Sequence, residues 1–505
     1  MRTADRIVQE LPWKWRVQGA IFLIGGLGFM FDAWDVALNG FLIPLVGQEW
    51  GLSSAQRGWI GTANLVGMAV GAVVWGAVAD TIGRKRAFSL TLLMFSLFSL
   101  AGAASPDYVA FCAFRFLAGV GLGGCIPVDY ALVGEFTPAR VRGRVLTAMD
   151  VWWPVGATLC GAVSTALLAL HSWRLLLAVM VLPALLLVWV RRSVPESPIY
   201  LVSRGRVDEA RAVVDDLVRR TGAAVDEPAR HPTTAPQGDA ARRGRIGHPA
   251  TAPQGDAARR GRIGRPTTAP QGDAARRGVG PAERESGRLT IASVGRQLAE
   301  LWRFGARVTS VAWLLFLTVF LVYYGALTWL PSILVAQGYG DYAAFMVTTL
   351  MTGIGVVGVL ASAWLVDVIG RKWVIGVSGP LAVLALVLFA VRLDVPAEAR
   401  WWITAFGFLI ELTIPALYAY VSELYPTWLR ASGFGWASTV SRVGSGFVPV
   451  LFGTVLWPYL GLPLTFAAIG GLLVLASLWM AVAAPETRGR ELDAPRVGEP
   501  VRDRE

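Results

Sequence analysis

Long apolar runs recur along most of the chain, and short polar breaks separate each run from the next. A run of about 20 apolar residues is long enough to cross a lipid bilayer as an α-helix. We therefore expect an all-α membrane protein with twelve transmembrane helices. The predicted spans are 18–46, 57–78, 88–105, 109–134, 145–170, 173–191, 308–336, 342–366, 373–392, 400–422, 431–457 and 462–484.

One long polar stretch divides these spans into two sets of six. We expect a cytoplasmic N-terminus at 1–17, a six-helix bundle at 18–192, a cytoplasmic linker at 193–306, a second six-helix bundle at 307–485 and a cytoplasmic tail at 486–505. In the linker, TAPQGDAARRG starts at Thr234 and again at Thr251 and Thr268. This repeat is too polar and too rich in Gly and Pro to bury a core, so it predicts disorder.

A second repeat relates the two halves. DTIGRK (Asp80 to Lys85) returns as DVIGRK (Asp367 to Lys372), and GEFTPARVRG (134–143) is echoed by SELYPTWLRASG (422–433). Each copy occupies the equivalent loop of its half. The pattern indicates two pseudo-symmetric bundles, an architecture in which a binding site lies between the halves near the membrane midplane.

Composition supports the membrane assignment and narrows the function. The chain is 54% hydrophobic and 16% charged, whereas soluble domains carry about 25% charged residues. The net charge of +11 does not indicate nucleic acid, because Arg and Lys gather in alternate loops. The positive-inside rule places those loops and both termini in the cytoplasm, and we expect a location in the cell membrane.

Few residues suit catalysis or metal binding. The three cysteines, Cys112, Cys125 and Cys160, fall in apolar runs without metal-site spacing, and the three histidines lie outside the predicted spans. No Ser/His/Asp set or nucleotide-binding loop is apparent. We expect neither an enzyme nor a protein with a metal or cofactor.

Several motifs carry a family resemblance: GAVADTIGRKRAF, DVIGRKW, RFLAGVGLGGCIPV, PESP, ELYPTWLR and PETRGR. Together they resemble the major facilitator superfamily, close to its sugar-porter side. FDAWDVALNG, IPVDYALVGEFTP, VYYGALTWLPSIL and SRVGSGF are similar to bacterial niacin transporters, neighbours of the aromatic-acid:proton symporters and the synaptic-vesicle-glycoprotein-like proteins. The resemblance implies a secondary transporter. Asp129 and Asp150 depart from it, because an uncharged residue and a glutamate are expected there.

The loop motifs place charges at helix ends, where they can pair with neighbouring helices and helix dipoles. Candidate partners are Glu135 with Arg142 and Glu423 with Arg430. The resemblance implies that such pairs latch one state of the transport cycle; the alternative is that the arginines only fix topology. The predicted gating residues are Asp80, Arg84, Glu135, Arg142, Asp367, Arg371, Glu423 and Arg430.

Acidic residues also occur inside the predicted spans. Gly25, Gly28, Asp32, Asp35 and Asn39 form one helical stripe, which must avoid lipid. Two carboxylates one turn apart cannot both ionise cheaply in a desolvated site, and such a pair titrates as a unit. We expect Asp32 and Asp35, with Glu411 in the tenth span, to couple transport to protons. The alternative is a structural acid balanced by Arg115 or Arg442, and Asp35 suits this alternative better.

Arg442 lies at a depth similar to that of Glu411, and its planar guanidinium matches a carboxylate group. It predicts an anionic substrate, although a permanent pair with Glu411 is an alternative. Tyr323 and Tyr324 offer faces for a flat ring, whereas we expect Trp329 in the interfacial aromatic belt. The predicted substrate-binding residues are Arg442, Tyr323, Tyr324, Asn39, Asp129, Asp150 and Trp153.

These features favour a monomeric, proton-coupled symporter of a small aromatic carboxylate such as nicotinate or a hydroxybenzoate. A sugar or polyol symporter is an alternative, but the spans offer few mid-depth amides and Arg442 would have no role. A proton-antiport exporter of amphipathic drugs is another, in which Asp129 and Asp150 could serve and Arg442 would be dispensable.

Overall fold

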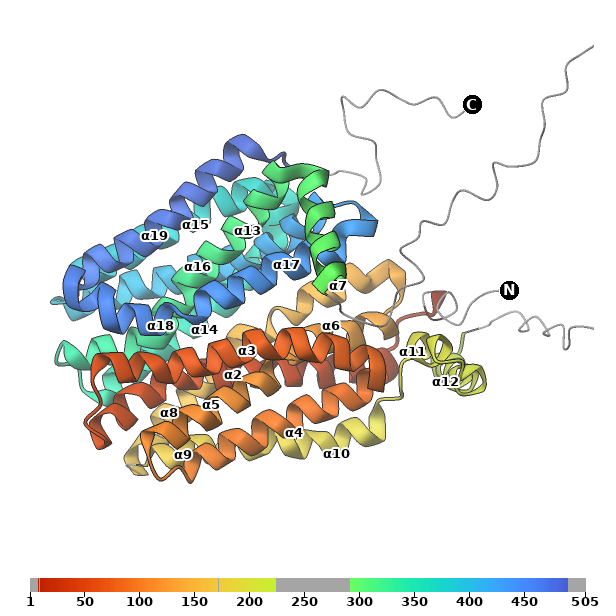
Figure 1. The fold of residues 1–505 in the computed structure, drawn as a ribbon, viewed down its shortest axis with the longest axis horizontal. Coiled ribbons are helices and arrows are strands. Elements are labelled where there is room, and N and C mark those ends of the chain that lie inside the picture. Colours follow the sequence, from red (N-terminus) through yellow and green to blue (C-terminus); the bar gives the residue numbers. More distant parts are fainter. Residues whose placement is uncertain (1–7, 9, 171, 224–290, 489–505) are drawn as a thin grey trace, which may run out of the picture. The chain divides into compact units, whose positions relative to one another are not determined.

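The computed structural model describes residues 8, 10–170, 172–223 and 291–488, which are almost entirely helical (Figure 1). Ten helices of the described part are long and apolar enough to cross a membrane. The last of these, Ser432–Ala483, has 52 residues and is broken at Gly461 (φ 70°), so it covers two predicted spans. The shorter apolar helix Trp173–Leu187 covers the sixth. The fold is therefore consistent with all twelve predicted crossings.

The first half contains three groups of helices in chain order. The first element is the π-helical turn η1 (Trp15–Gly19). The first group of helices then consists of α2 (Ala20–Glu49), α3 (Ser54–Ile82), α4 (Arg84–Ala103), α5 (Tyr108–Gly123) and α6 (Cys125–Phe136). The next are α7 (Ala139–Met149), α8 (Trp152–Leu167), η2 (Leu168–Leu170), α9 (Trp173–Ala178), η3 (Val179–Val181) and α10 (Leu182–Ser193). Two short helices follow, α11 (Pro198–Ser203) and α12 (Val207–Thr221).

The second half repeats this layout. Its helices are α13 (Ile291–Ala336), α14 (Asp341–Val368), α15 (Arg371–Val391), α16 (Pro396–Leu424), α17 (Thr427–Gly446), α18 (Val448–Leu451), η6 (Phe452–Leu456) and α19 (Trp457–Ala483). Both halves belong to one compact unit, in which α3 packs against α17 and α18, and α8 packs against α14. In Figure 1 the first half runs from red to yellow and the second from green to blue.

The segments around the bundles differ in part from the prediction. The predicted linker begins with two helices, α11 and α12. At its other end, α13 begins at Ile291 rather than 308, and extended backbone at Gly305 divides it. Residues 224–290, which hold the 17-residue repeats, lie outside the described residues, so their disorder stays a prediction. Residues 1–7, 9 and 489–505 lie outside as well.

The two copies of the repeated motif make equivalent contacts at the end of the bundles that carries the basic loops, here called the basic end. Arg84 donates to Glu135 at 3.1 Å, and Arg371 contacts Glu423 at 3.2 Å. Arg371 also pairs with Asp367 at 3.3 Å. The matching geometry follows from the matching sequences of the two halves.

Correct partners could not all be assigned from spacing. Arg142 donates to the carbonyl of Thr137 at 3.1 Å and forms no ion pair with Glu135 in the described structure, so that expected pair is wrong. Glu423 pairs with Arg371, and Arg430 lies half-buried in α17. The side chain of Asp80 lies outside the described residues.

Two glutamates cap the helices that follow the repeated motif. Glu196 of PESP accepts from the Lys85 backbone N at 3.2 Å, and Glu486 of PETRGR accepts from the Arg371 and Lys372 backbone N at 3.1 and 3.0 Å. An anion is stabilised there because the first backbone N–H groups of a helix lack partners within the helix. Glu486, placed at the start of the tail by prediction, is therefore part of the folded bundle.

The bundles approach each other most closely through glycines near the end opposite the basic loops. A Cβ added to Gly40 would lie 2.6 Å from the carbonyl O of Leu327, and one added to Gly58 would lie 2.5 Å from the carbonyl O of Pro449. A Cβ on Gly61 would meet Thr328 at 2.8 Å. Small residues allow this helix contact in a membrane, where close packing replaces the hydrophobic effect between helices.

Replacing Gly58 by leucine is expected to separate the bundles at this end. Overpacking costs about 1–3 kcal/mol, which shifts a two-state equilibrium by roughly 5- to 150-fold. A single cysteine at Thr328, in a variant lacking Cys112, Cys125 and Cys160, should then react faster with an impermeant thiol reagent.

The matched control is Gly76→Leu in the same helix, because no atom lies within 4 Å of a Cβ placed there. Equal labelling rates in both variants would show that the contact at Gly58 does not keep the bundles together at this end.

Candidate functional site

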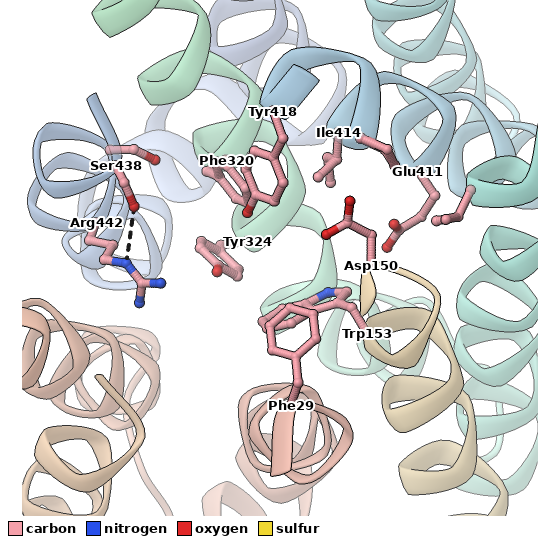
Figure 2. A pocket seen from close by; sticks show the side chains of 13 residues that line it. Phe29, Asp150, Trp153, Phe320, Tyr324, Glu411, Ile414, Tyr418, Ser438 and Arg442 are labelled. Carbon is pink, nitrogen blue, oxygen red and sulfur yellow. Dashed lines mark hydrogen bonds between the residues drawn. The ribbon is translucent and has the colours of Figure 1, made fainter. Parts of the chain in front are cut away.

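A pocket lies between the two halves, with walls from α2, α8, α13, α14, α16 and α17. It encloses about 510 Å³ of space between atoms, a value that includes open solvent. Its lining residues are Phe29, Asp150, Trp153, Phe320, Tyr324, Val359, Glu411, Ile414, Pro415, Tyr418, Ser438, Ser441 and Arg442 (Figure 2).

Arg442 marks the positively charged side of this pocket. Its Nε is 3.5 Å from Ser438 Oγ one helical turn earlier, and its Nη1 is buried without a hydrogen-bond partner in the described structure. Within the same residues no ion pair joins Arg442 to Glu411, so this structure does not contain the pair given as an alternative. A half-buried guanidinium that has no acid partner among the described residues is suited to bind an anion.

Two carboxyl groups mark the other side. Asp150, between α7 and α8, accepts a hydrogen bond from the Tyr130 hydroxyl. Glu411 of α16 lies near the Tyr323 hydroxyl, which accepts from Trp153 Nε1 at 2.8 Å. Figure 2 shows Asp150 and Glu411 together, across the pocket from Arg442.

Aromatic rings form the walls between the two sides. Phe29 and Trp153 have ring centroids 5.5 Å apart on one wall, and Phe320 and Tyr418 stack at 6.2 Å on the other. Tyr324 lies between Arg442 and the acids, 5.5 Å from Phe320 (Figure 2). Rings so placed offer flat apolar faces to a planar ligand.

Asp32 and Asp129 meet inside the first bundle, outside the pocket lining. Both are fully buried, and their carboxylate oxygens have no hydrogen-bond partner among the described residues. Asp129 Oδ2 lies 3.0 Å from the Cβ position of Gly28, one turn before Asp32 on α2. Arg442 is near enough to Asp32 to interact electrostatically.

Asp35 belongs instead to a closed polar network. Arg115 donates to its two carboxylate oxygens at 2.9 and 2.8 Å, and Ser99 and Asn64 donate at 2.9 and 3.2 Å. Asn39 accepts from Arg115 Nε at 3.1 Å and donates to Asn64 at 2.9 Å. This geometry corresponds to the structural alternative stated for Asp35, and it directs Asn39 away from the pocket.

The structure thus brings together only part of the predicted set. The predicted residues that line the pocket are Asp150, Trp153, Tyr324, Glu411 and Arg442. Tyr323 is one hydrogen bond away, through Trp153, whereas Asp32, Asp35, Asn39 and Asp129 lie outside the lining.

Sequence reasoning missed Phe29, Tyr418 and Ser438. A signal existed for two of them, because Tyr418 lies two turns after Glu411 and Ser438 one turn before Arg442 on the same helical faces. Trp329 was assigned wrongly to the membrane interface. It is 1% exposed, donates to the Pro449 carbonyl at 3.1 Å and therefore packs inside the protein.

Comparisons with known proteins agree with this architecture. The family model described as Major Facilitator Superfamily matches residues 25–403 and 341–504. A niacin transporter from Acinetobacter baylyi is 31% identical over 472 residues, covering 93% of this chain and 94% of the relative. A gallate transporter from Pseudomonas putida is 30% identical, covering 91% and 89%.

Among solved structures, the chain resembles the partially occluded inward open conformation of the xylose transporter from E. coli. The TM-score is 0.69 at 16% sequence identity, and the match covers 94% of this chain and 99% of that one. At this identity the likeness supports the fold.

Proposed function

Because the chain belongs to the major facilitator superfamily and is a multi-pass membrane transporter, we propose that it carries a small aromatic carboxylate together with a proton. The observation that carries this proposal is Arg442, a guanidinium without an acid partner in the described pocket, beside aromatic walls. Relatives named for niacin and gallate support it, since both compounds are aromatic rings with one carboxylate.

In this proposal the substrate carboxylate binds the free guanidinium edge of Arg442, and the ring lies between the aromatic walls. A charge-assisted, two-pronged contact fixes both the position and the plane of the carboxylate. Phe320 and Tyr418 on one side, with Phe29 and Trp153 on the other, would hold the ring.

Asp32 is the proposed proton carrier, with Asp129 as its neighbour. A buried carboxylate that lacks hydrogen-bond partners carries a large desolvation penalty as an anion, and it avoids this penalty when it binds a proton. Two such groups side by side cannot both be ionised cheaply. One proton per monoanion would make the cycle electroneutral and would let a pH gradient drive it.

The other predicted substrates fit the pocket less well. None of the described lining residues is an asparagine or glutamine, whereas sugar recognition needs several groups that match hydroxyls. An unpaired guanidinium in the pocket disfavours a cationic drug by like-charge repulsion.

The basic end is assigned to the cytoplasm by the positive-inside rule, which places both termini inside and the protein in the cell membrane. Access would alternate by rocking of the two bundles around the central pocket. The charges of the repeated motifs, among them Arg84–Glu135 and Arg371–Glu423, would stabilise one state of this cycle. We expect the protein to act as a monomer.

The test is uptake of radiolabelled nicotinate and 4-hydroxybenzoate into proteoliposomes with an imposed inward proton gradient. The proposal predicts accumulation that depends on the gradient and disappears with a protonophore. Failure to take up any aromatic carboxylate, with proton flux provoked by a sugar or a cationic drug, would overturn it.

Replacing Asp32 by asparagine is expected to abolish gradient-driven accumulation while substrate exchange across the membrane survives. The amide keeps the size of the side chain but cannot carry the proton, so only the coupled step is lost. Asp394→Asn, an exposed acid near the start of α16, is the matched control and should transport normally. Accumulation by Asp32→Asn at the wild-type level would remove this residue from the coupling mechanism.

A further inference from the structure

The charged groups on the two sides of the pocket indicate a second polar feature of the substrate, in addition to its carboxylate. We propose that the preferred substrate carries a hydrogen-bond donor, a hydroxyl or amino group, on the side of the ring opposite its carboxylate. This inference rests on the proposed function and concerns the same pocket. It distinguishes hydroxylated or aminated benzoates from benzoate itself and from nicotinate.

The first support is the separation of charge. Arg442 lies on one side of the aromatic walls, and Asp150 with Glu411 lies on the other (Figure 2). No ion pair joins the arginine to either acid within the described residues; its Nε contacts Ser438 and its Nη1 has no hydrogen-bond partner there. A ligand anchored by its carboxylate at Arg442 and stacked along the walls therefore directs its far edge toward two carboxyl groups.

The second support is the direction of the hydrogen bonds around these acids. Tyr130 donates its hydroxyl proton to Asp150. Trp153 donates to the oxygen of Tyr323, which leaves the Tyr323 proton to be donated to another acceptor, and Glu411 is the carboxyl group near it. Both carboxyl groups are thus held as acceptors by the protein.

Their remaining lone pairs are acceptors toward the pocket. A phenolic hydroxyl or an aromatic amine satisfies them, whereas a bare ring edge satisfies none of them. The ring nitrogen of nicotinate is itself an acceptor, so it cannot satisfy these lone pairs. A site built to bind a hydroxyl discriminates strongly against an analogue that lacks it, because the buried acceptors are then unpaired.

The experiment is direct binding to the full-length protein, purified in detergent and measured by calorimetry. The probes are 4-hydroxybenzoate, 4-aminobenzoate, benzoate, 4-methoxybenzoate and nicotinate. The methoxy compound keeps the ring substituent and its oxygen but has no proton to donate. We expect 4-hydroxybenzoate and 4-aminobenzoate to bind at least about tenfold more tightly than the other three.

Glu411→Gln is expected to reduce this preference to about twofold or less, because the amide replaces one acceptor oxygen by a donor. The thermal unfolding midpoint of this variant, measured beside that of the wild type, shows whether the pocket remains folded. Glu398→Gln, an exposed acid on the same helix that pairs only with exposed Arg392 at 3.6 Å, is the matched control and should keep the full preference.

The outcomes separate the two proposals. Equal affinities for 4-hydroxybenzoate and 4-methoxybenzoate, or a preference that survives in both Glu411→Gln and Asp150→Asn, would overturn the inference and leave the proposed function standing. Absence of binding by all five compounds would overturn the proposed function itself. Tight binding of nicotinate with weak binding of the hydroxylated rings would reject the inference alone.

Discussion

Arg442→Gln is expected to weaken binding of 4-hydroxybenzoate by roughly 30-fold to several thousand-fold. Truncating one partner of a buried, hydrogen-bonded charge pair costs about 2–5 kcal/mol, and each 1.4 kcal/mol is a factor of about ten in affinity. The neutral amide loses the ionic contact and leaves the substrate carboxylate desolvated against the aromatic walls. The dissociation constant, measured by calorimetry on the purified protein, gives the result directly.

Two further variants make this test specific. Arg442→Lys keeps the positive charge but loses the planar fork, so its affinity should lie between those of the wild type and the glutamine variant. Arg174→Gln removes a half-exposed arginine that pairs with Glu49 at 2.9 Å, and it should bind normally. If Arg442→Gln bound as tightly as the wild type with an unchanged unfolding temperature, the carboxylate anchor would lie elsewhere.

Arg115→Met is expected to destabilise the first bundle by about 3–5 kcal/mol. The substitution removes the partner of Asp35 and leaves a carboxylate in a site where both side chains are 0% exposed. A buried charge without its counter-ion is far more costly than the loss of an exposed pair. The unfolding midpoint of the detergent-purified protein, followed by tryptophan fluorescence, should fall sharply.

A charge-neutral double variant separates the lost charge balance from lost packing. Asp35→Asn combined with Arg115→Met removes both charges, and the single amide oxygen can still accept from Ser99 or from Asn64, which donate to different oxygens of Asp35. It should recover a large part of the stability lost in the single variant. Arg206→Met, at an exposed pair with Glu209, should shift the midpoint little. Equal instability of the single and double variants would show that the network matters through its shape alone.

The transmembrane helices were predictable because apolar length is a local property of the sequence. The stripe on the first span also predicted correctly that Asp32 and Asp35 face the protein interior, where both are 0% exposed. Asp35 was favoured as the structural acid, but whether Arg115 or Arg442 would balance its charge was not predictable. That choice depends on how closely α5 approaches α3, and a Cβ added to Gly119 would lie 2.1 Å from the Asn64 carbonyl.

Sequence reasoning found the charged lining residues together with Trp153 and Tyr324. It missed the other aromatic residues of the lining, Phe29, Phe320 and Tyr418. A charge in an apolar span stands out, so Arg442 and Glu411 could be recognised from sequence. A phenylalanine or tyrosine does not stand out, because the same residue types fill the core and the membrane interface. Trp329 belongs to the core and Tyr418 to the pocket. Neither residue could be assigned to core, interface or pocket without knowledge of its tertiary contacts.

The hydrogen bond from Trp153 to Tyr323 joins a residue of the first half to one of the second, directly beside the pocket. Thermodynamic reciprocity then applies to it. If rocking of the bundles changes the free energy of this contact, any ligand or proton that alters the contact shifts the rocking equilibrium by the same factor. Through this hydrogen bond, the occupancy of the pocket would change the populations of the two orientations of the bundles.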